Sequence, residues 1–216
     1  MKKLLQNQFK DFLFIIQARL NSSRLPNKVL LSLKGKSILE FLYLQIKKEF
    51  TRSKIIVAIP DSEKNLLLRK YLKKIKIKYD TGPEYDLVSR YQKVCKNINS
   101  KYIVRLTCDN PLINFKLIKY CLKSHLLSKK NFSSTRNIVK KKIFRFFPKG
   151  HSVDIINKYE LMKIDSKKLS SYEKEHLVPY LYKNLNCNFI KNKKLREKLK
   201  LKSQSVDTLK DYFKII

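Results

Sequence analysis

Short apolar segments alternate with amphipathic segments from Phe12 to Leu127, and this order narrows the choice of folds more than any other feature of the chain. The apolar runs have the length of buried strands, and the longer segments repeat leucine and isoleucine at helical spacing. We expect strands at 12–17, 54–59, 75–79 and 102–106, and helices at 37–50, 61–74, 85–97 and 114–127. Such alternation predicts an α/β fold with a parallel sheet and helices on both faces.

The second half of the chain is less regular. We expect short strands or a hairpin at 131–135 and 138–147, a strand at 152–156, a helix at 170–185, a strand at 204–207 and a C-terminal helix from 208. Ser37 with Glu40, and Ser170 with Glu173, have the spacing of capping boxes at helix starts. The sequence predicts one domain over residues 1–216, in which about 131–160 form an irregular hairpin insertion.

Positive charge dominates the composition, with 50 lysines and arginines against 17 acids and a net charge of +33. Clustered lysines are typical of proteins that bind nucleic acids. Here they occur in almost every predicted helix rather than in one stripe, which favours a solvated surface. A basic, non-catalytic nucleic-acid-binding protein therefore remains only an alternative, although the charge would attract anionic ligands.

The sequence predicts a cytoplasmic protein that does not bind membranes. Its four cysteines include no C-x-x-C pair, which argues against a zinc cluster or a disulfide framework. Lys10 and Asp11 interrupt the apolar N-terminal residues, unlike a secretion signal. None of the apolar runs approaches the roughly 20 residues that a membrane span needs.

The loop that follows the first predicted strand carries three cations, Arg19, Arg24 and Lys28. Ligands of open α/β sheets bind beyond the carboxyl ends of the strands. Guanidinium and ammonium groups match the oxygens and the charge of a polyphosphate. The glycines of a Walker loop are absent. The pattern indicates either a phosphate-binding loop or a solvated basic loop.

Two aspartates lie at later strand ends. Asp109 follows the predicted strand 102–106, and Asp207 precedes the C-terminal helix. Carboxylates at such positions either hold Mg²⁺ beside a phosphate or cap the following helix. Two of them in one sheet make a metal pair more plausible than either alone.

Two further segments carry polar residues, 148–154 and 172–180. Glu175 and His176 face different sides of the predicted helix, and Pro179 in mid-helix indicates a constrained position. We interpret His125 as a surface residue of an amphipathic helix. The three histidines lack the spacing of zinc ligands.

Seven segments together resemble the acylneuraminate-type cytidylyltransferases, particularly the branch of spore-coat polysaccharide biosynthesis proteins. They occur in the family's order and span nearly the whole chain. These segments are IIQARLNSSRLPNKVL (15–30), GKSILEFL (35–42), the spacing of Gly82, Asp86 and Arg90-Tyr91, VRLTCDNPLI (104–113), PKGHSVDI (148–155), EKEHLVPYLY (173–182) and SVDTLKDY (205–212).

The resemblance implies a GT-A-like, Rossmann-related fold, with CTP and Mg²⁺ as ligands and pyrophosphate as a product. It implies that Arg19, Arg24 and Lys28 are the catalytic cations. The implied nucleotide-binding residues are these three with Ala18, Ser22, Ser23, Asp86 and Arg105. The implied metal ligands are Asp109 and Asp207, and the implied sugar-binding residues are Asp154, Glu175 and His176.

The function that follows is transfer of CMP from CTP to an acidic sugar, nonulosonic or related, for a surface polysaccharide. The resemblance also implies that a homodimer is possible. A nucleotidyltransferase that uses another nucleotide or a sugar phosphate is the alternative enzyme. Three departures bear on activity: Asn21 and Cys108 stand where the family often has glycine, and His151 lies in a turn that is usually more acidic.

Overall fold

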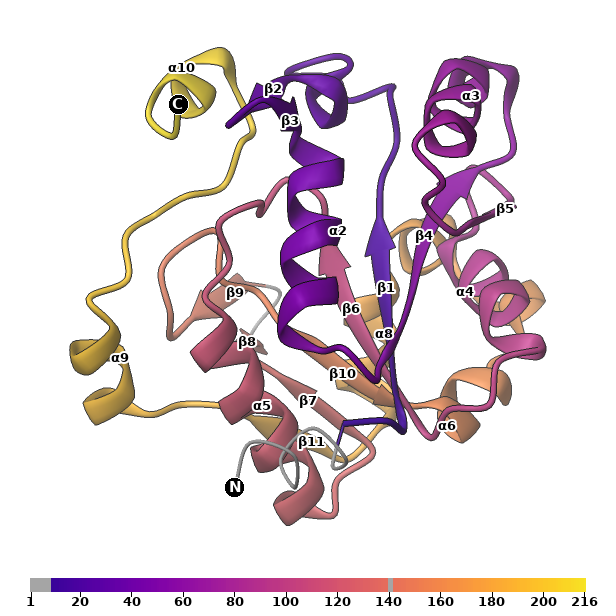
Figure 1. Cartoon of the computed structure of the whole chain (residues 1–216). Coiled ribbons are helices and arrows are strands. Elements are labelled where there is room, and N and C mark those ends of the chain that lie inside the picture. The colour runs from indigo at the N-terminus through magenta and orange to yellow at the C-terminus, as the bar shows by residue number, and fades with distance from the viewer. Residues whose placement is uncertain (1–8, 140–141) are drawn as a thin grey trace.

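The computed structural model describes residues 9–139 and 142–216. Its centre is a sheet of seven strands in the order β11-β7-β10-β6-β1-β4-β5 (Figure 1). The strands are β1 (Phe12–Gln17), β4 (Lys54–Pro60), β5 (Tyr79–Gly82), β6 (Tyr102–Thr107), β7 (Phe132–Ser134), β10 (Asp154–Asn157) and β11 (Cys187–Phe189). The pairing is parallel except around β10, which runs antiparallel to β6 and β7. The predicted α/β class with a mostly parallel sheet is confirmed.

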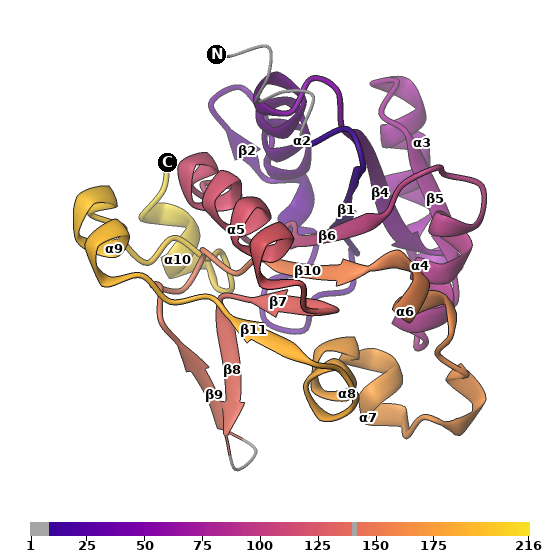
Figure 2. The same cartoon turned by 90° about the horizontal axis from the view of Figure 1, so that it is seen from below.

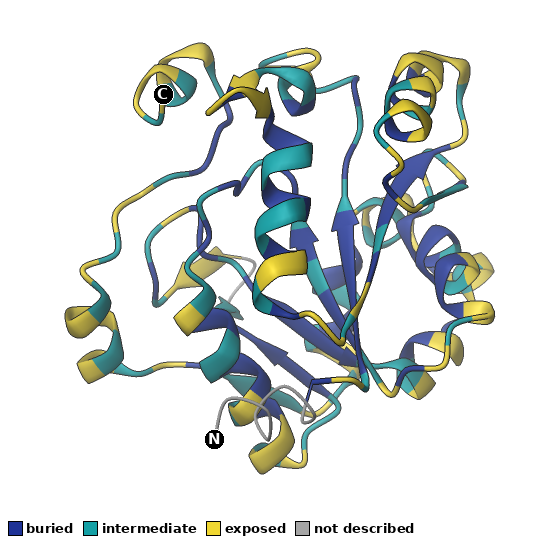
Figure 3. Cartoon of the chain, viewed as in Figure 1, coloured by how far each residue is buried: buried dark blue, intermediate teal, exposed yellow. Residues whose placement is uncertain are grey.

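Helices cover both faces of the sheet, because β1, an interior strand, is apolar on both sides. Phe14 and Ile16 belong to one core, and Leu13 and Ile15 to the other, as alternation along a strand requires. The first core packs against α2 (Ile38–Glu49), α3 (Leu66–Lys74) and α5 (Phe115–Ser128). The second packs against α4 (Leu87–Lys96), α6 (Lys158–Met162) and α8 (Leu177–Asn184) (Figure 2). Between the two cores, β1, β7 and β10 are almost entirely buried, whereas the edge strands β5 and β11 are mostly half-buried (Figure 3).

Short elements surround this framework. Two hairpins, β2 (Ser32–Leu33) with β3 (Lys36–Ser37) and β8 (Arg136–Val139) with β9 (Lys142–Arg145), pair separately from the main sheet. The remaining elements are η1 (Lys28–Leu30), η2 (Glu63–Asn65), η3 (Ser166–Lys168), α7 (Ser171–Glu175), α9 (Lys193–Leu199) and α10 (Leu209–Phe213). Across residues 9–139 and 142–216, each helix is too short or too polar to cross a bilayer.

The third strand lies later than the sequence predicts. Residues 75–78 contain the C-cap of α3 and a turn in which Lys76 has a φ of 55°, and the strand begins only at Tyr79. The strand itself is the more polar Tyr79–Gly82, which forms an edge and pairs only with β4 among the described residues. The apolar Ile77 misled the prediction because it packs into the core from the turn.

The predicted helix at 170–185 is two helices. Ser170 and Glu173 form the expected capping box, but α7 ends at Glu175, and α8 begins at Leu177 after His176. Pro179 therefore lies in the first turn of α8, where a missing N–H costs no intrahelical hydrogen bond. Here the proline helps to define a helix start and is not a strained residue.

Three smaller predictions are also wrong. Ser37 accepts a hydrogen bond from Glu40 N, but the Glu40 carboxylate bonds to Lys36 and Tyr71, so the capping box is half formed. Residues 204–207 are extended chain without strand pairing. His125 is 2% exposed, because its ring bonds to Ser133 Oγ and Asn157 Oδ1 inside the fold.

Candidate active site

A polar cavity of about 600 Å³ lies at the carboxyl end of β6, beside the C-terminal return of the chain. Val206 N donates to Asp109 O at 2.8 Å, which fastens the segment 205–207 to the end of β6. The cavity is lined by Arg24, Arg105, Thr107, Asp109, Asn110, Arg136, Arg145, Lys149, Gly150, Ser152, Ser205 and Asp207. This is the end of the sheet at which α/β proteins bind ligands.

Lys28 lies between the two predicted metal-binding acids. Its ammonium is 3.3 Å from Asp207 Oδ1 and 3.7 Å from Asp109 Oδ2, and it donates to Val206 O at 2.8 Å. Only 12% of the Lys28 side chain is exposed. The ammonium therefore stabilises the charged forms of both carboxylates and holds the C-terminal segment against η1.

Asp207 has two further cationic neighbours. Arg24 Nη2 lies 3.0 Å from Oδ1, and Lys149 Nζ lies 2.6 Å from Oδ2. Burial raises the pKa of Asp207, but the hydrogen bond from Lys149 and the charge of Lys28 outweigh it, so this pKa lies below its ordinary value. The carboxylate is held in its charged form.

The acid pair fits a divalent cation that also binds substrate phosphates. Asp109 Oδ1 is buried and has no hydrogen-bond partner among the described residues, so a ligand position is open there. In residues 9–139 and 142–216, no group of three or more His, Cys, Asp or Glu side chains could enclose a metal. Mg²⁺ requires no such cage, since it commonly binds one or two carboxylates together with phosphates and water.

A second cavity of about 240 Å³ adjoins the first, and Arg105 and Arg136 line both. Its other walls are mostly apolar and come from the β8–β9 hairpin and from α7 and α8. They are formed by Ile138, Ile143, Tyr172, His176, Val178, Pro179 and Tyr182. The break between α7 and α8 leaves His176 at this cavity.

Asp154 lies beneath the shared wall and is 1% exposed. Its carboxylate bonds to Arg105 Nη1 at 2.8 Å, to Arg136 Nη2 at 2.5 Å and to Ser134 Oγ at 2.7 Å. Burial opposes its charge, but the charges of Arg136 and Arg105 outweigh burial and lower the pKa of Asp154. Two guanidinium groups share one carboxylate, which leaves an excess positive charge between the cavities.

The predicted phosphate loop is held from both sides. Leu20 N donates to the buried Asn65 Oδ1 at 3.0 Å, and Asn21 Nδ2 donates to Glu84 Oε1 at 2.5 Å. Arg19 Nη1 lies 3.6 Å from Glu175 Oε1, so the loop reaches the corner between α7 and α8. Asn21, a departure from the family pattern, thus gains a partner that glycine lacks.

The structure brings some predicted site residues together and separates others. Arg24, Lys28, Asp109 and Asp207 form one cluster, Arg19 and Glu175 a second contact, and Arg105 and Asp154 a third. Ala18 is buried, Ser22 is half-buried, and Ser23 is exposed. Asp86 is the N-cap of α4, since its carboxylate accepts from Ser89 N and Oγ.

Two departures from the family pattern are buried. Cys108 is 2% exposed, and its N–H donates to Gln17 O at 3.0 Å, which joins the ends of β6 and β1. His151 is also 2% exposed, and its ring contacts Asn114 N and Lys202 O. His151 thus packs beneath the 148–151 turn and does not line the cavities.

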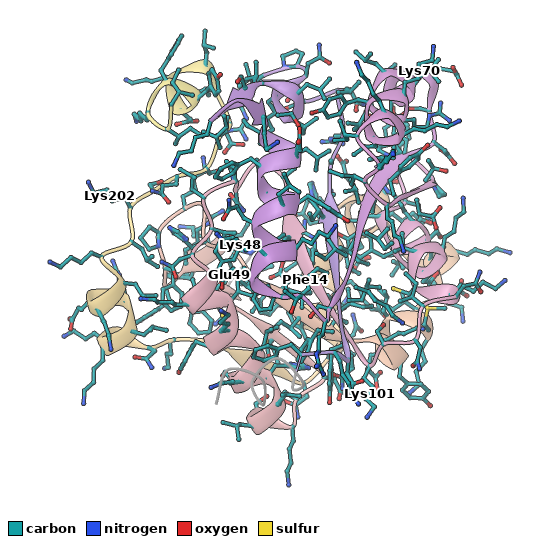
Figure 4. The ribbon with its side chains drawn as sticks, in the orientation of Figure 1. Phe14, Lys48, Glu49, Lys70, Lys101 and Lys202 are labelled. Carbon is teal, nitrogen blue, oxygen red and sulfur yellow. The ribbon has the colours of Figure 1, made fainter. Side chains whose placement is uncertain are left out.

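Sequence reasoning missed three basic cavity residues, Arg136, Arg145 and Lys149. Arg136 and Arg145 pair across the β8–β9 hairpin. Lys149 lies in the PKGHSVDI segment, one of the segments that carry the family resemblance. Its position in the turn of that segment could have identified it as a site residue. Their charges did not stand out because lysines point outward all round the molecule, as Lys70, Lys101 and Lys202 do in Figure 4.

Comparison with known proteins identifies the family. The family model of the cytidylyltransferases matches residues 13–213. The chain belongs to the cytidylyltransferase family. It is therefore a nucleotidyltransferase, and CTP is the nucleotide that the family supports. The alternative of a non-catalytic basic protein is set aside.

Relatives of this cytidylyltransferase span most of its length. The uncharacterized protein MJ1063 of Methanocaldococcus jannaschii is 32% identical over 200 residues, which cover 92% of this chain and 79% of the relative. The spore coat polysaccharide biosynthesis protein SpsF of Bacillus subtilis is 27% identical over 176 residues, which cover 79% of this chain and 70% of the relative. The solved structure of a cytidylyltransferase from Leptospira borgpetersenii has a TM-score of 0.78 at 29% identity. The match covers 94% of this chain and 83% of the other. The nucleotidyltransferase fold is confirmed.

Proposed function

We propose that this cytidylyltransferase transfers CMP from CTP to an acidic sugar, nonulosonic or related, in the synthesis of a surface polysaccharide. The observation that carries the proposal is the pair of adjoining cavities, one polar and next to two acids, the other mostly apolar, with Arg105 and Arg136 between them. The polysaccharide part draws on the likeness to the spore coat polysaccharide biosynthesis protein.

We assign the polar cavity and the β1 loop to the nucleotide. Arg19, Arg24 and Lys28 bind phosphate oxygens, helped by Ser22 and Ser23. Guanidinium and ammonium groups there neutralise charge on the departing pyrophosphate. Asp109 and Asp207 would hold Mg²⁺, which would supply a Lewis acid that neutralises phosphate oxygens.

We assign the second cavity to the sugar. The excess positive charge of Arg105 and Arg136 over Asp154 fits an anionic group of the acceptor. The apolar walls next to it fit a deoxy carbon or an acyl group. Glu175 and His176 lie on the side of this cavity that meets the β1 loop, where they orient the acceptor.

The chemistry then consists mainly of positioning. A hydroxyl oxygen of the sugar forms a bond to the α-phosphorus of CTP and gives up its proton to solvent, while the bond from that phosphorus to the oxygen bridging the α- and β-phosphates breaks. Pyrophosphate leaves with the bridging oxygen and its electron pair. Holding the two substrates in neighbouring cavities aligns the attacking oxygen and replaces a bimolecular encounter.

A sugar phosphate is the second candidate acceptor, because the same excess charge accepts a phosphate. Pyrophosphate release is measured with each of CTP, UTP, GTP and ATP, with Mg²⁺, and with a nonulosonic acid or a neutral sugar 1-phosphate as acceptor. We expect release with CTP and the acid. Release only with the sugar phosphate, or only with another nucleotide, contradicts the proposal.

A further inference from the structure

Lys149 forms an ion pair with Asp207, and this pair affects how a metal ion can bind to the site. The Lys149 ammonium lies 2.6 Å from Asp207 Oδ2, while Arg24 and Lys28 take Oδ1. Backbone contact maintains the arrangement, since Gln204 N donates to Lys149 O at 2.9 Å. Both oxygens of this predicted metal ligand therefore already have cationic partners.

The charges around the acid pair disfavour a free divalent cation. Lys28, Arg24 and Lys149 supply three positive charges beside the two carboxylates, and Arg145 lines the same cavity. A doubly charged ion that approaches Asp207 alone is repelled by these groups and must displace one of them. A metal that arrives bound to a triphosphate brings enough negative charge to reverse the repulsion.

The three cations differ in their freedom to move. Lys28 is 12% exposed and is tied to Val206 O, so it is the least free of the three to move. Lys149 is 46% exposed and Arg24 is 62% exposed, and both lie in or beside the cavity that we assign to phosphates. A long lysine side chain at its rim can turn from a carboxylate oxygen to a phosphate oxygen.

We propose that Lys149 is an exchange residue of this site: it neutralises Asp207 while the site lacks nucleotide and moves to a phosphate oxygen when the metal–triphosphate complex enters. The inference rests on the proposed function, since it requires a triphosphate at this cavity. This exchange makes metal binding dependent on nucleotide binding. It gives Lys149 the role of releasing Asp207 to the metal, which the residues of the β1 loop do not have.

Two separate titrations test the exchange by calorimetry, one with Mn²⁺ alone and one with α,β-methylene-CTP in EDTA. In Lys149→Met, removal of one neighbouring charge should tighten Mn²⁺ binding about tenfold and weaken binding of the analogue about tenfold. The opposite signs are diagnostic, because structural damage weakens both. Lys149→Arg keeps the charge and should leave both affinities near those of the wild type.

The matched control is Lys202→Met, an exposed lysine in the same C-terminal segment (Figure 4). It should change neither affinity, since it removes the same net charge away from the acids. Unchanged affinities in Lys149→Met, or a loss of both, overturn the exchange. If the wild type fails to bind the cytidine analogue with or without Mn²⁺, the proposed function itself fails.

Discussion

The Lys28 ammonium lies 3.3 Å from Asp207 Oδ1, although the two residues are 179 positions apart in the sequence. Lys28 also reaches Asp109, so a single cation joins the β1 loop, the end of β6 and the C-terminal segment. The candidate site therefore exists only after residues 205–207 have packed against the end of β6 and against η1.

Substitution of Arg24 and substitution of Lys28 should affect catalysis equally but should affect the stability of the protein differently. Arg24→Ala or Lys28→Ala should lower kcat/KM for CTP by about 10²-fold or more, the scale of a lost transition-state contact. Lys28→Ala should also lower the Tm, because two carboxylates then face each other around a buried vacancy. Arg24→Ala should leave the Tm nearly unchanged, because the Arg24 side chain is 62% exposed.

Steady-state kinetics and thermal unfolding of both variants check this prediction. Lys70→Ala, an exposed lysine on α3, is the control and should match the wild type in both measurements. Unchanged kinetics in both site variants would refute the assignment of the β1 loop to the triphosphate.

Gly150 holds the C-terminal segment in place by allowing a close approach. Its φ is 99°, and a Cβ there would lie 2.8 Å from Gln204 C and Ser205 N. Gly150→Ala should displace the segment that carries Asp207, and so lower both stability and kcat/KM. Gly35→Ala is the matched control, because φ is 75° there but nothing lies within 4 Å of a Cβ.

Gly35→Ala should cost only the backbone strain of about 1–2 kcal/mol and leave kcat/KM unchanged. Urea denaturation and steady-state kinetics of the two variants separate the two effects. Equal losses of stability with unchanged kinetics in both variants would show that the approach of Gly150 to residues 204 and 205 does not position Asp207.

Asp154 is predicted to be more important for stability than an ordinary ion pair. Asp154→Asn leaves Arg105 and Arg136 without their shared carboxylate, and breaking a buried pair in this way costs about 3–5 kcal/mol. Urea denaturation measures this loss. Glu63→Gln removes an exposed partner of Arg69 and should cost less than about 1 kcal/mol. A similar small loss in Asp154→Asn contradicts the buried-cluster interpretation.

Acidification should destabilise the fold through two buried histidines. Burial lowers the pKa of His125 and that of His151 below the ordinary value. The unfolded chain takes up protons near pH 6.5, before the folded chain does, so their contribution is complete above that pH and is lost as the pH falls below it.

Urea denaturation between pH 7.5 and 5.0 should therefore give a falling free energy of unfolding. His125→Gln should weaken the dependence, whereas His176→Gln, at an exposed residue, should keep it. Stability that stays constant over this range, or rises toward pH 5.0, contradicts the prediction.

Local sequence patterns predicted an element correctly where its own residues showed the hydrophobic pattern typical of that element. The continuous apolar run Phe12–Gln17 is β1 with the predicted bounds, because a strand buried on both faces needs no polar residues. Edge elements were harder: the strand Tyr79–Gly82 is polar, and only its pairing with β4 makes it a strand. His125 on α5 was misplaced because its partners, Ser133 and Asn157, come from strands β7 and β10.

The sequence by itself indicated four of the charged groups at the candidate site, since Arg24, Lys28, Asp109 and Asp207 stand in recognisable motifs near expected strand ends. Only the tertiary structure decided that Lys28 lies between the acids and that Lys149 and Arg136 join the cavities. The physical reason is that motifs record short-range order along the chain, whereas an ion pair depends on the distance between atoms that folding brings together.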